Sequence, residues 1–183
     1  MKIKTALCSI TLAATTLMLA NAPAFAVSEL SVLRMLKSPK TSDKTLESLM
    51  GNWRGAGKLR TGSNEKAEAT QCRFNNKWAA SGKLAYLKLS CRGTEASFTA
   101  EGYLGRSGNE YRGAWSTSTG RNAFMSGRRS GSGLRLTLTS SRSADAEKST
   151  LTLRMSGKTI NAKLTARDTD TGKTFTAFTT TLK

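Results

Sequence analysis

A two-residue hydrophobic period runs from Gly51 to the C-terminus and limits the folds open to this chain of 183 residues. Apolar and polar side chains alternate along short segments, and Gly, Ser and Asn interrupt them about every 8 to 12 residues. This pattern is typical of an all-β sandwich or barrel. It predicts strands over residues 51–60, 66–74, 83–92, 95–104, 110–117, 121–129, 133–142, 148–156, 158–166 and 173–182.

The links between these segments are short, as in SGNE, SGSG and SGK. Only hairpins join strands that closely, so we expect an antiparallel meander of about eight to ten strands. An open meander leaves two edges that invite aggregation, and closure into a small barrel removes them. Glycines at positions 55, 57, 102 and 113 fall on the apolar side of the strands, where they suit the sharp coiling of a narrow barrel.

The alternation gives the barrel one apolar face and one basic, threonine-rich face. Leu134 and Leu136 share the first face, for example, and Arg135 lies on the second. Six aromatic residues are predicted in the barrel interior: Trp53, Phe74, Phe98, Tyr111, Trp115 and Phe175. Cations recur at the outward positions of strand after strand, and a basic turn, GRR, adds two more. The candidate anion-binding residues are Arg54, Arg112, Arg128, Arg129, Arg135 and Arg154.

The first 26 residues have the features of an export signal. Lys2 and Lys4 precede an apolar run, and AFA at 24–26 is an A-x-A cleavage site. An uncleaved anchor is the alternative. Removal of the two lysines leaves 27 basic and 12 acidic residues, a formal charge of +15. Residues 27–50 are expected to form a short helical segment, with Ser28 and then Ser42 or Asp43 as N-caps and with Leu30, Leu33 and Leu36 near one helical face. The barrel domain then covers 51–183.

Cysteine usage agrees with export to the periplasm. Cys8 lies in the leader, and Cys72 and Cys91 remain on strands that a hairpin makes neighbours. In an oxidising compartment this pair is expected to form a disulfide, and two free buried thiols are the alternative. The chain has no histidine, which excludes Ser-His-Asp and Cys-His catalytic sites and leaves the two cysteines short of a zinc ligand set.

Three other motif matches lack residues that their chemistry requires. The segment GNWRGAGKL at 51–59 lacks the glycine of a phosphate-binding P-loop at position 52, and Leu59 stands where a hydroxyl residue is needed. The S-x-x-K match at 63–66 lacks its companion elements, and DTDTG at 168–172 departs from a calcium loop in its glycine position. We therefore expect neither an enzyme nor a metal or cofactor.

The segment Gly51, Asn52 and Trp53, placed after a helical lead-in, resembles the opening G-x-W of the lipocalin and avidin group of up-and-down barrels. The resemblance implies that Trp53 closes one end of the barrel and packs under an arginine from a late strand, Arg154 or Arg167. The whole chain also resembles small exported β-barrel proteins of Gram-negative bacteria.

These observations favour a non-enzymatic periplasmic barrel that contacts the membrane peripherally through anionic lipid or glycolipid. A face that only keeps the barrel soluble is the simpler alternative. A carrier of a small apolar or amphipathic ligand and a protease inhibitor that inserts residues 27–40 into an enzyme are two further alternatives. Nucleic acid is not an expected partner, because few aromatic residues lie among the basic positions.

Overall fold

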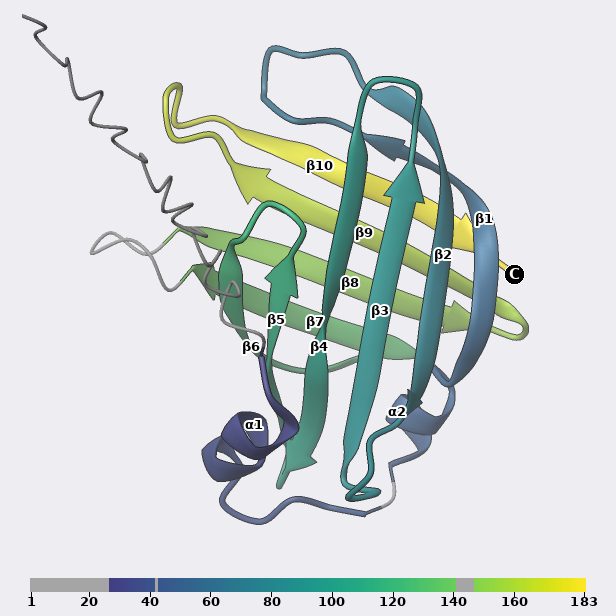
Figure 1. Cartoon of the computed structure of the whole chain (residues 1–183), viewed down its shortest axis with the longest axis vertical. Helices are drawn as coiled ribbons and strands as arrows, with labels where there is room; N and C mark the ends of the chain where they lie inside the picture. Colours follow the sequence, from purple (N-terminus) through teal and green to yellow (C-terminus); the bar gives the residue numbers. More distant parts are fainter. Residues whose placement is uncertain (1–26, 42, 141–146) are drawn as a thin grey trace, which may run out of the picture.

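The structure is a computed structural model that describes residues 27–41, 43–140 and 147–183. The predicted leader at 1–26, the alternative cap Ser42 and the last two residues of the strand expected at 133–142 lie outside this part. Two short helices precede ten strands (Figure 1). The elements are α1 (Glu29–Met35), α2 (Lys44–Glu47), β1 (Gly51–Leu59), β2 (Glu68–Trp78), β3 (Leu84–Arg92), β4 (Ser97–Ser107), β5 (Glu110–Thr117), β6 (Asn122–Ser130), β7 (Gly133–Ser140), β8 (Lys148–Ser156), β9 (Thr159–Arg167) and β10 (Thr174–Leu182).

The ten strands form a closed antiparallel barrel in which each strand pairs with its neighbours in sequence and β10 pairs with β1. Figure 1 shows β2–β5 crossing β7–β10, so the barrel is flattened into two layers. The all-β class, the meander and the closure are thereby confirmed, and they match the up-and-down barrel that the family resemblance implies. Neither described helix is long or apolar enough to span a bilayer.

Cys72 and Cys91 lie directly opposite each other on β2 and β3 and form the expected disulfide. Both side chains are buried in the core. The bond therefore fixes the register of one hairpin from inside the barrel and is shielded from solvent.

Inward side chains fill the barrel. Phe74, Tyr111 and Trp115 are buried, and Trp53 and Phe98 are half-buried and pack against the same core. The space left between Phe74, Trp115 and Leu151 is only about 10 Å³, close to the minimum that one water needs. Phe175 also occupies an inward position, but it lies half-buried at the open end.

Inward glycines let the strands approach closely. A Cβ added at Gly102 would lie 2.1 Å from the carbonyl oxygen of Ala114 on β5, and one added at Gly55 would lie 1.9 Å from that of Thr181 on β10. A side chain at either position would overlap the neighbouring backbone, so these glycines permit the tight coiling expected from their place on the apolar side.

Helix α2 closes one end of the barrel. Leu46 and Leu49 belong to the barrel core, and the Leu49 carbonyl accepts hydrogen bonds from Trp53 Nε1 (3.0 Å) and Asn76 Nδ2 (2.8 Å). Asp43 caps α2, and its carboxylate also accepts from Arg106 of β4 (2.6 Å) and from the Tyr111 hydroxyl (3.0 Å).

The arginine that closes this end is therefore Arg106. The expectation of a late-strand arginine over Trp53 is wrong, because Arg154 is exposed on the outer face and Arg167 Nε donates to the Gly172 carbonyl at the opposite end. Arg154 and Arg167 cannot cover Trp53 because they point outward, in alternation with the inward apolar residues of β8 and β9.

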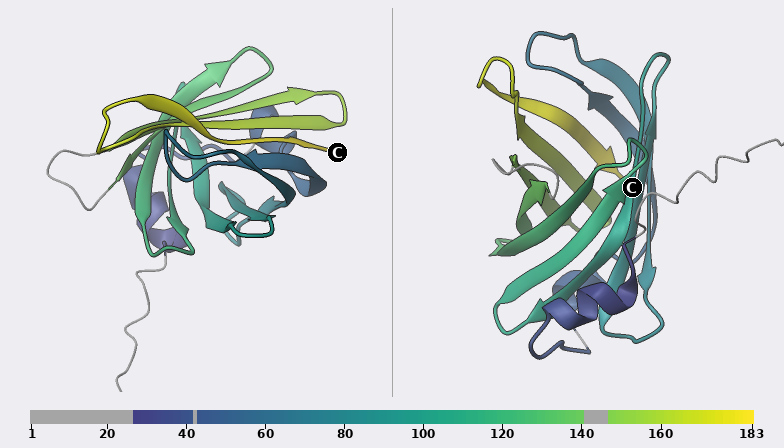
Figure 2. Two further views of the ribbon diagram at one scale, coloured as in Figure 1. Left: turned by 90° about the horizontal axis from the view of Figure 1, so that it is seen from above. Right: turned by 60° about the vertical axis from the view of Figure 1, so that its left-hand side comes forward.

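Helix α1 packs against the outside of the barrel near the closed end (Figure 2). Ser28 caps it, as expected, and Val32 and Leu36 are buried against Leu84 and Ala114. Leu30, expected on the apolar face of the helix, is 58% exposed. The helix instead directs Val32 and Leu36, which are four residues apart, against the wall, with Leu33 packed beside them.

Candidate anion-binding surface

Charge is divided unevenly between the two halves of the barrel. Strands β1 and β6–β10, here called the basic half-barrel, contain nine basic residues and no Asp or Glu. The nine are Arg54, Lys58, Arg128, Arg129, Arg135, Lys148, Arg154, Lys163 and Arg167. Strands β2, β4 and β5 carry Glu68, Glu101 and Glu110. Carboxylates that could neutralise the cations are thus confined, among the strands, to the other half.

One cross-strand row forms the centre of the basic half-barrel. Strand register places its members side by side on the outer face: Lys58, Thr179, Lys163, Thr152, Arg135 and Arg128. Neighbouring strands lie about 4.8 Å apart, so the cations of β1, β9 and β7 recur at roughly twice that distance with a threonine between them. A row of hydroxyl residues flanks it: Thr176, Thr165, Thr150, Thr137 and Ser126.

Two pairs of arginines face each other directly across strands. Arg128 lies opposite Arg135, and Arg54 lies opposite Arg73 of β2. Like charges in this arrangement destabilise a sheet. Of these four residues, only Arg128 has a carboxylate partner in the described part of the chain, Glu110 at 3.6 Å. Among the described residues, Arg54, Arg73 and Arg135 therefore face a like charge on the outer surface without a carboxylate partner.

The six candidate arginines have different surroundings in the structure. Arg54, Arg135 and Arg154 are exposed on the basic half-barrel. Arg112 lies on β5 and pairs with Glu110 at 2.8 Å, the same carboxylate that Arg128 approaches. Arg129 belongs to β6, and its Nε donates to the Gly131 carbonyl. Within the described residues, no carboxylate thus pairs with Arg54, Arg129, Arg135 or Arg154.

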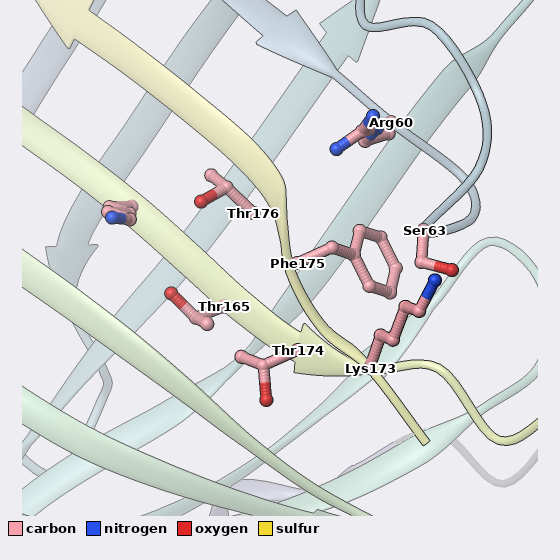
Figure 3. A pocket seen from close by; sticks show the side chains of 8 residues that line it. Arg60, Ser63, Thr165, Lys173, Thr174, Phe175 and Thr176 are labelled. Carbon is pink, nitrogen blue, oxygen red and sulfur yellow. The ribbon is translucent and has the colours of Figure 1, made fainter. Parts of the chain in front are cut away.

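An open pocket of about 480 Å³ lies over the outer side of β9 and β10, close to the barrel end that is opposite α2 (Figure 3). We call it the mouth pocket. Arg60 and Ser63 line it from the segment after β1, and the other lining residues come from β9, β10 and the turn between them. Its lining consists of Arg60, Ser63, Lys163, Thr165, Lys173, Thr174, Phe175 and Thr176. The lining therefore comprises three basic residues, four hydroxyl residues and one aromatic residue, and no carboxylate.

Hydrogen bonds hold the two loops of the mouth pocket together. Ser63 N donates to Asp168 Oδ2 (2.9 Å), and the hydroxyls of Ser63 and Thr171 lie 3.1 Å apart. Asp168 Oδ1 also accepts from the backbone N–H of Asp170 and of Thr171. The bonds from Ser63 and Thr171 hold the pKa of Asp168 far below its ordinary value, so this carboxylate remains ionised. The loop that carries Lys173 is thus anchored to the loop that carries Ser63.

A β-bulge shapes the same pocket. The register of β10 against β9 shifts between Thr176 and Phe178, which leaves Ala177 as the extra residue. The bulge allows both Phe175 and Phe178 to occupy inward positions although they are three residues apart. Phe175 consequently lies at the rim between the core and the cationic lining.

Strand phase in the sequence predicts outward cations such as Arg54 and Arg135, but it does not identify Lys173 and does not predict the mouth pocket. Alternation indicates which side of a strand a residue occupies. It contains no information on which loops meet, and the Ser63–Asp168 contact joins residues 105 positions apart.

Comparison with known proteins adds no assignment, since neither a protein-family profile nor a curated protein matches this chain.

Proposed function

We propose that this protein is a non-enzymatic exported barrel that binds reversibly to anionic lipid or glycolipid of the bacterial envelope through the basic half-barrel. The observation that carries the proposal is the segregation of charge: six adjacent strands contain nine basic residues and no carboxylate. The leader-like N-terminus and the Cys72–Cys91 disulfide support an oxidising compartment such as the periplasm.

Segregated charge favours a binding role over a solubilising one. A soluble surface needs both signs of charge interspersed, and it gains nothing from directly opposed arginines such as Arg128 and Arg135. A surface of phosphates relieves such repulsion, because each basic residue near an anionic leaflet contributes about 1 kcal/mol of attraction. Arginine also binds phosphate through two parallel hydrogen bonds.

The two alternative functions receive less support. A carrier needs interior volume, and the space between the inward residues Phe74, Trp115 and Leu151 is only about 10 Å³. An inhibitor that inserts residues 27–40 needs this segment free, whereas Val32 and Leu36 are buried against the barrel wall and Lys40 N donates to the Arg106 carbonyl. Insertion would require this docked segment to detach first.

Co-sedimentation with lipid vesicles tests the proposal. The protein is mixed with phosphatidylcholine vesicles with and without phosphatidylglycerol, from about 0.05 M to about 0.5 M salt. We expect binding only with the anionic lipid, and we expect it to fall steeply as salt screens the charges. Lys58→Gln, Arg135→Gln and Arg154→Gln together should weaken partitioning by about 100-fold, which corresponds to about 1 kcal/mol per residue.

A matched triple variant controls for net charge. Lys44→Gln, Lys77→Gln and Arg92→Gln also remove three exposed cations, from α2, β2 and β3. This control should retain most of the binding, since its changes lie outside the basic half-barrel. Equal losses in both variants, or binding that ignores lipid charge, would refute the proposal.

A further inference from the structure

The mouth pocket has the dimensions and the lining of a site for a small anionic molecule. Its volume of about 480 Å³ lies within the range of about 300 to 1,000 Å³ that is usual for small-molecule sites. Lys163 lines it from the outer side of β9, Lys173 from the β9–β10 turn and Arg60 from the segment after β1. Figure 3 shows Arg60 and Lys173 on two separate segments, with the Phe175 ring between them.

The polar groups that line the pocket are available to a ligand. Within the described part of the chain, no hydrogen bond or ion pair engages the ammonium groups of Lys163 and Lys173, and none engages the hydroxyls of Thr165, Thr174 and Thr176. Arg60 donates through Nε to the Glu65 carbonyl, a contact that holds the side chain and leaves its terminal nitrogens for another acceptor. The Arg60 side chain is therefore held in place while its terminal nitrogens stay available to a ligand.

The carboxylates of the same loops are engaged elsewhere. Asp168 accepts hydrogen bonds from three backbone N–H groups, those of Ser63, Asp170 and Thr171. Glu65 accepts a hydrogen bond from the Thr61 hydroxyl. Neither carboxylate lines the pocket, so a ligand meets cations and hydroxyls. These contacts also prevent the loops from opening freely, which reduces the entropy lost on binding.

The composition of the lining selects a class of ligand. Three cations exceed what a single carboxylate can neutralise, whereas a phosphate monoester carries about −1.5 to −2 charges at neutral pH and three acceptor oxygens. The threonine and serine hydroxyls can exchange hydrogen bonds with the hydroxyls of a saccharide. Phe175 offers an aromatic face to the apolar side of a sugar ring.

We propose that the mouth pocket binds a sugar phosphate, with the phosphate held by Arg60, Lys163 and Lys173 and the sugar held by the hydroxyls and Phe175. In the envelope, such a group occurs as the phosphorylated saccharide of a glycolipid. This source rests on the proposed function, whereas the recognition of the free sugar phosphate does not. The pocket adds a stereochemically defined contact to the diffuse attraction of the basic half-barrel.

Titration of the purified protein with glucose 1-phosphate tests the site. We expect saturable binding by calorimetry, with amide chemical-shift changes concentrated at 60–63 and 168–176. Lys173→Gln should weaken binding by about tenfold, the usual effect of losing one charge-assisted hydrogen bond. Arg154→Gln removes the same charge from the outer face and should leave the affinity unchanged. Glucose should not bind measurably, and inorganic phosphate should bind more weakly than the sugar phosphate.

The outcomes separate this inference from the proposed function. Absence of saturable binding, or equal binding by Lys173→Gln and the wild type, would overturn the pocket assignment even where the vesicle experiment succeeds. Phosphate binding as strong as that of the sugar phosphate would overturn the saccharide contribution. Sugar phosphate binding together with failed vesicle binding would support the pocket and refute membrane association. Binding to phosphorylated glycolipid vesicles that Lys173→Gln weakens, at a salt concentration that abolishes binding to phosphatidylglycerol, would support both.

Discussion

Asp43 connects three parts of the closed end through one carboxylate. It caps α2 by accepting from Thr45 N and Leu46 N, and it also accepts from Arg106 and Tyr111. Burial alone would raise the pKa of Asp43. The hydrogen bonds from Arg106, Leu46 and Tyr111, together with the charge of Arg106, outweigh burial and hold the pKa below its ordinary value of 3.8.

Asp43→Asn should lower the stability of the barrel at neutral pH by about 1 to 3 kcal/mol, because asparagine can still cap the helix but cannot pair with the Arg106 charge. A pKa lowered by folding contributes stability above the pKa of the unfolded chain, and this contribution is lost as the pH falls through the folded value. Urea unfolding should therefore show a difference from the wild type that shrinks as the pH is taken below 3.8. Glu47→Gln, on the exposed side of α2, is the control and should change little. A difference that grows in acid would contradict this account.

Trp53 contributes to the closed end through both its ring and its N–H. Trp53→Ala should cost about 2 to 4 kcal/mol, somewhat less than for a fully buried tryptophan because the side chain is half-buried. Trp53→Phe keeps most of the ring but loses the bond to the Leu49 carbonyl, and should cost about 1 kcal/mol. Phe124→Ala provides the control, since Phe124 is 51% exposed on the outer face. Equal midpoints for Trp53→Ala and Phe124→Ala in urea would exclude a structural role for Trp53.

Alternation in the sequence correctly predicts the side of the sheet on which a residue lies where strand phase alone determines it. Alternation placed Leu134 and Leu136 inside and Arg135 outside, and the structure has them so. It failed for the arginine at the closed end, because Arg106 reaches Asp43 across 63 positions of sequence and no local pattern encodes that contact.

At the scale of elements, the strands and their order were predictable because hairpins are local. The least regular segment, expected at 121–129, is β6 (Asn122–Ser130). Helix α1 was also predictable from its cap, but its buried stripe was not, because the wall that receives Val32 is formed by the distant strands β3, β4 and β5. The bulge in β10 was equally hidden, since Thr176, Ala177 and Phe178 contain no glycine to mark it.

The inward glycines give a prediction at this scale. Gly102→Ala should destabilise the barrel by about 1 to 3 kcal/mol, because the new Cβ would lie 2.1 Å from the Ala114 carbonyl oxygen and force β4 and β5 apart. Gly62→Ala is the matched control: its Cβ would meet only the Glu65 side chain, at 3.6 Å. Thermal unfolding of both variants measures the difference. If Gly102→Ala unfolds at the wild-type temperature, the strands are not held as closely as the structure indicates.

At the scale of the whole molecule, the sequence predicts the basic surface in part and the mouth pocket not at all. The excess of basic residues and their outward phase are visible in the chain itself, whereas their concentration on β1 and β6–β10 becomes meaningful only once β10 pairs with β1 and joins these strands into one surface. The mouth pocket depends in addition on two loops that meet at the open end. The pocket arises from contacts between distant segments, so local sequence patterns do not predict it.

An oriented surface predicts an oriented complex, and amine-reactive labelling followed by mass spectrometry detects it without any mutation. With vesicles that contain phosphatidylglycerol, Lys58 and Lys163 should be labelled less, because they lie in the central row of the basic half-barrel. Lys44 on α2 and Lys77 on β2 should be labelled as in solution, because attraction to the leaflet extends only about 8 Å at physiological salt. Phosphatidylcholine vesicles provide the control and should protect none of the four. Uniform protection would indicate binding without a preferred face. Selective protection of Lys77 would place the membrane contact on the opposite side of the barrel, because β2 and β3 lie outside the basic half-barrel.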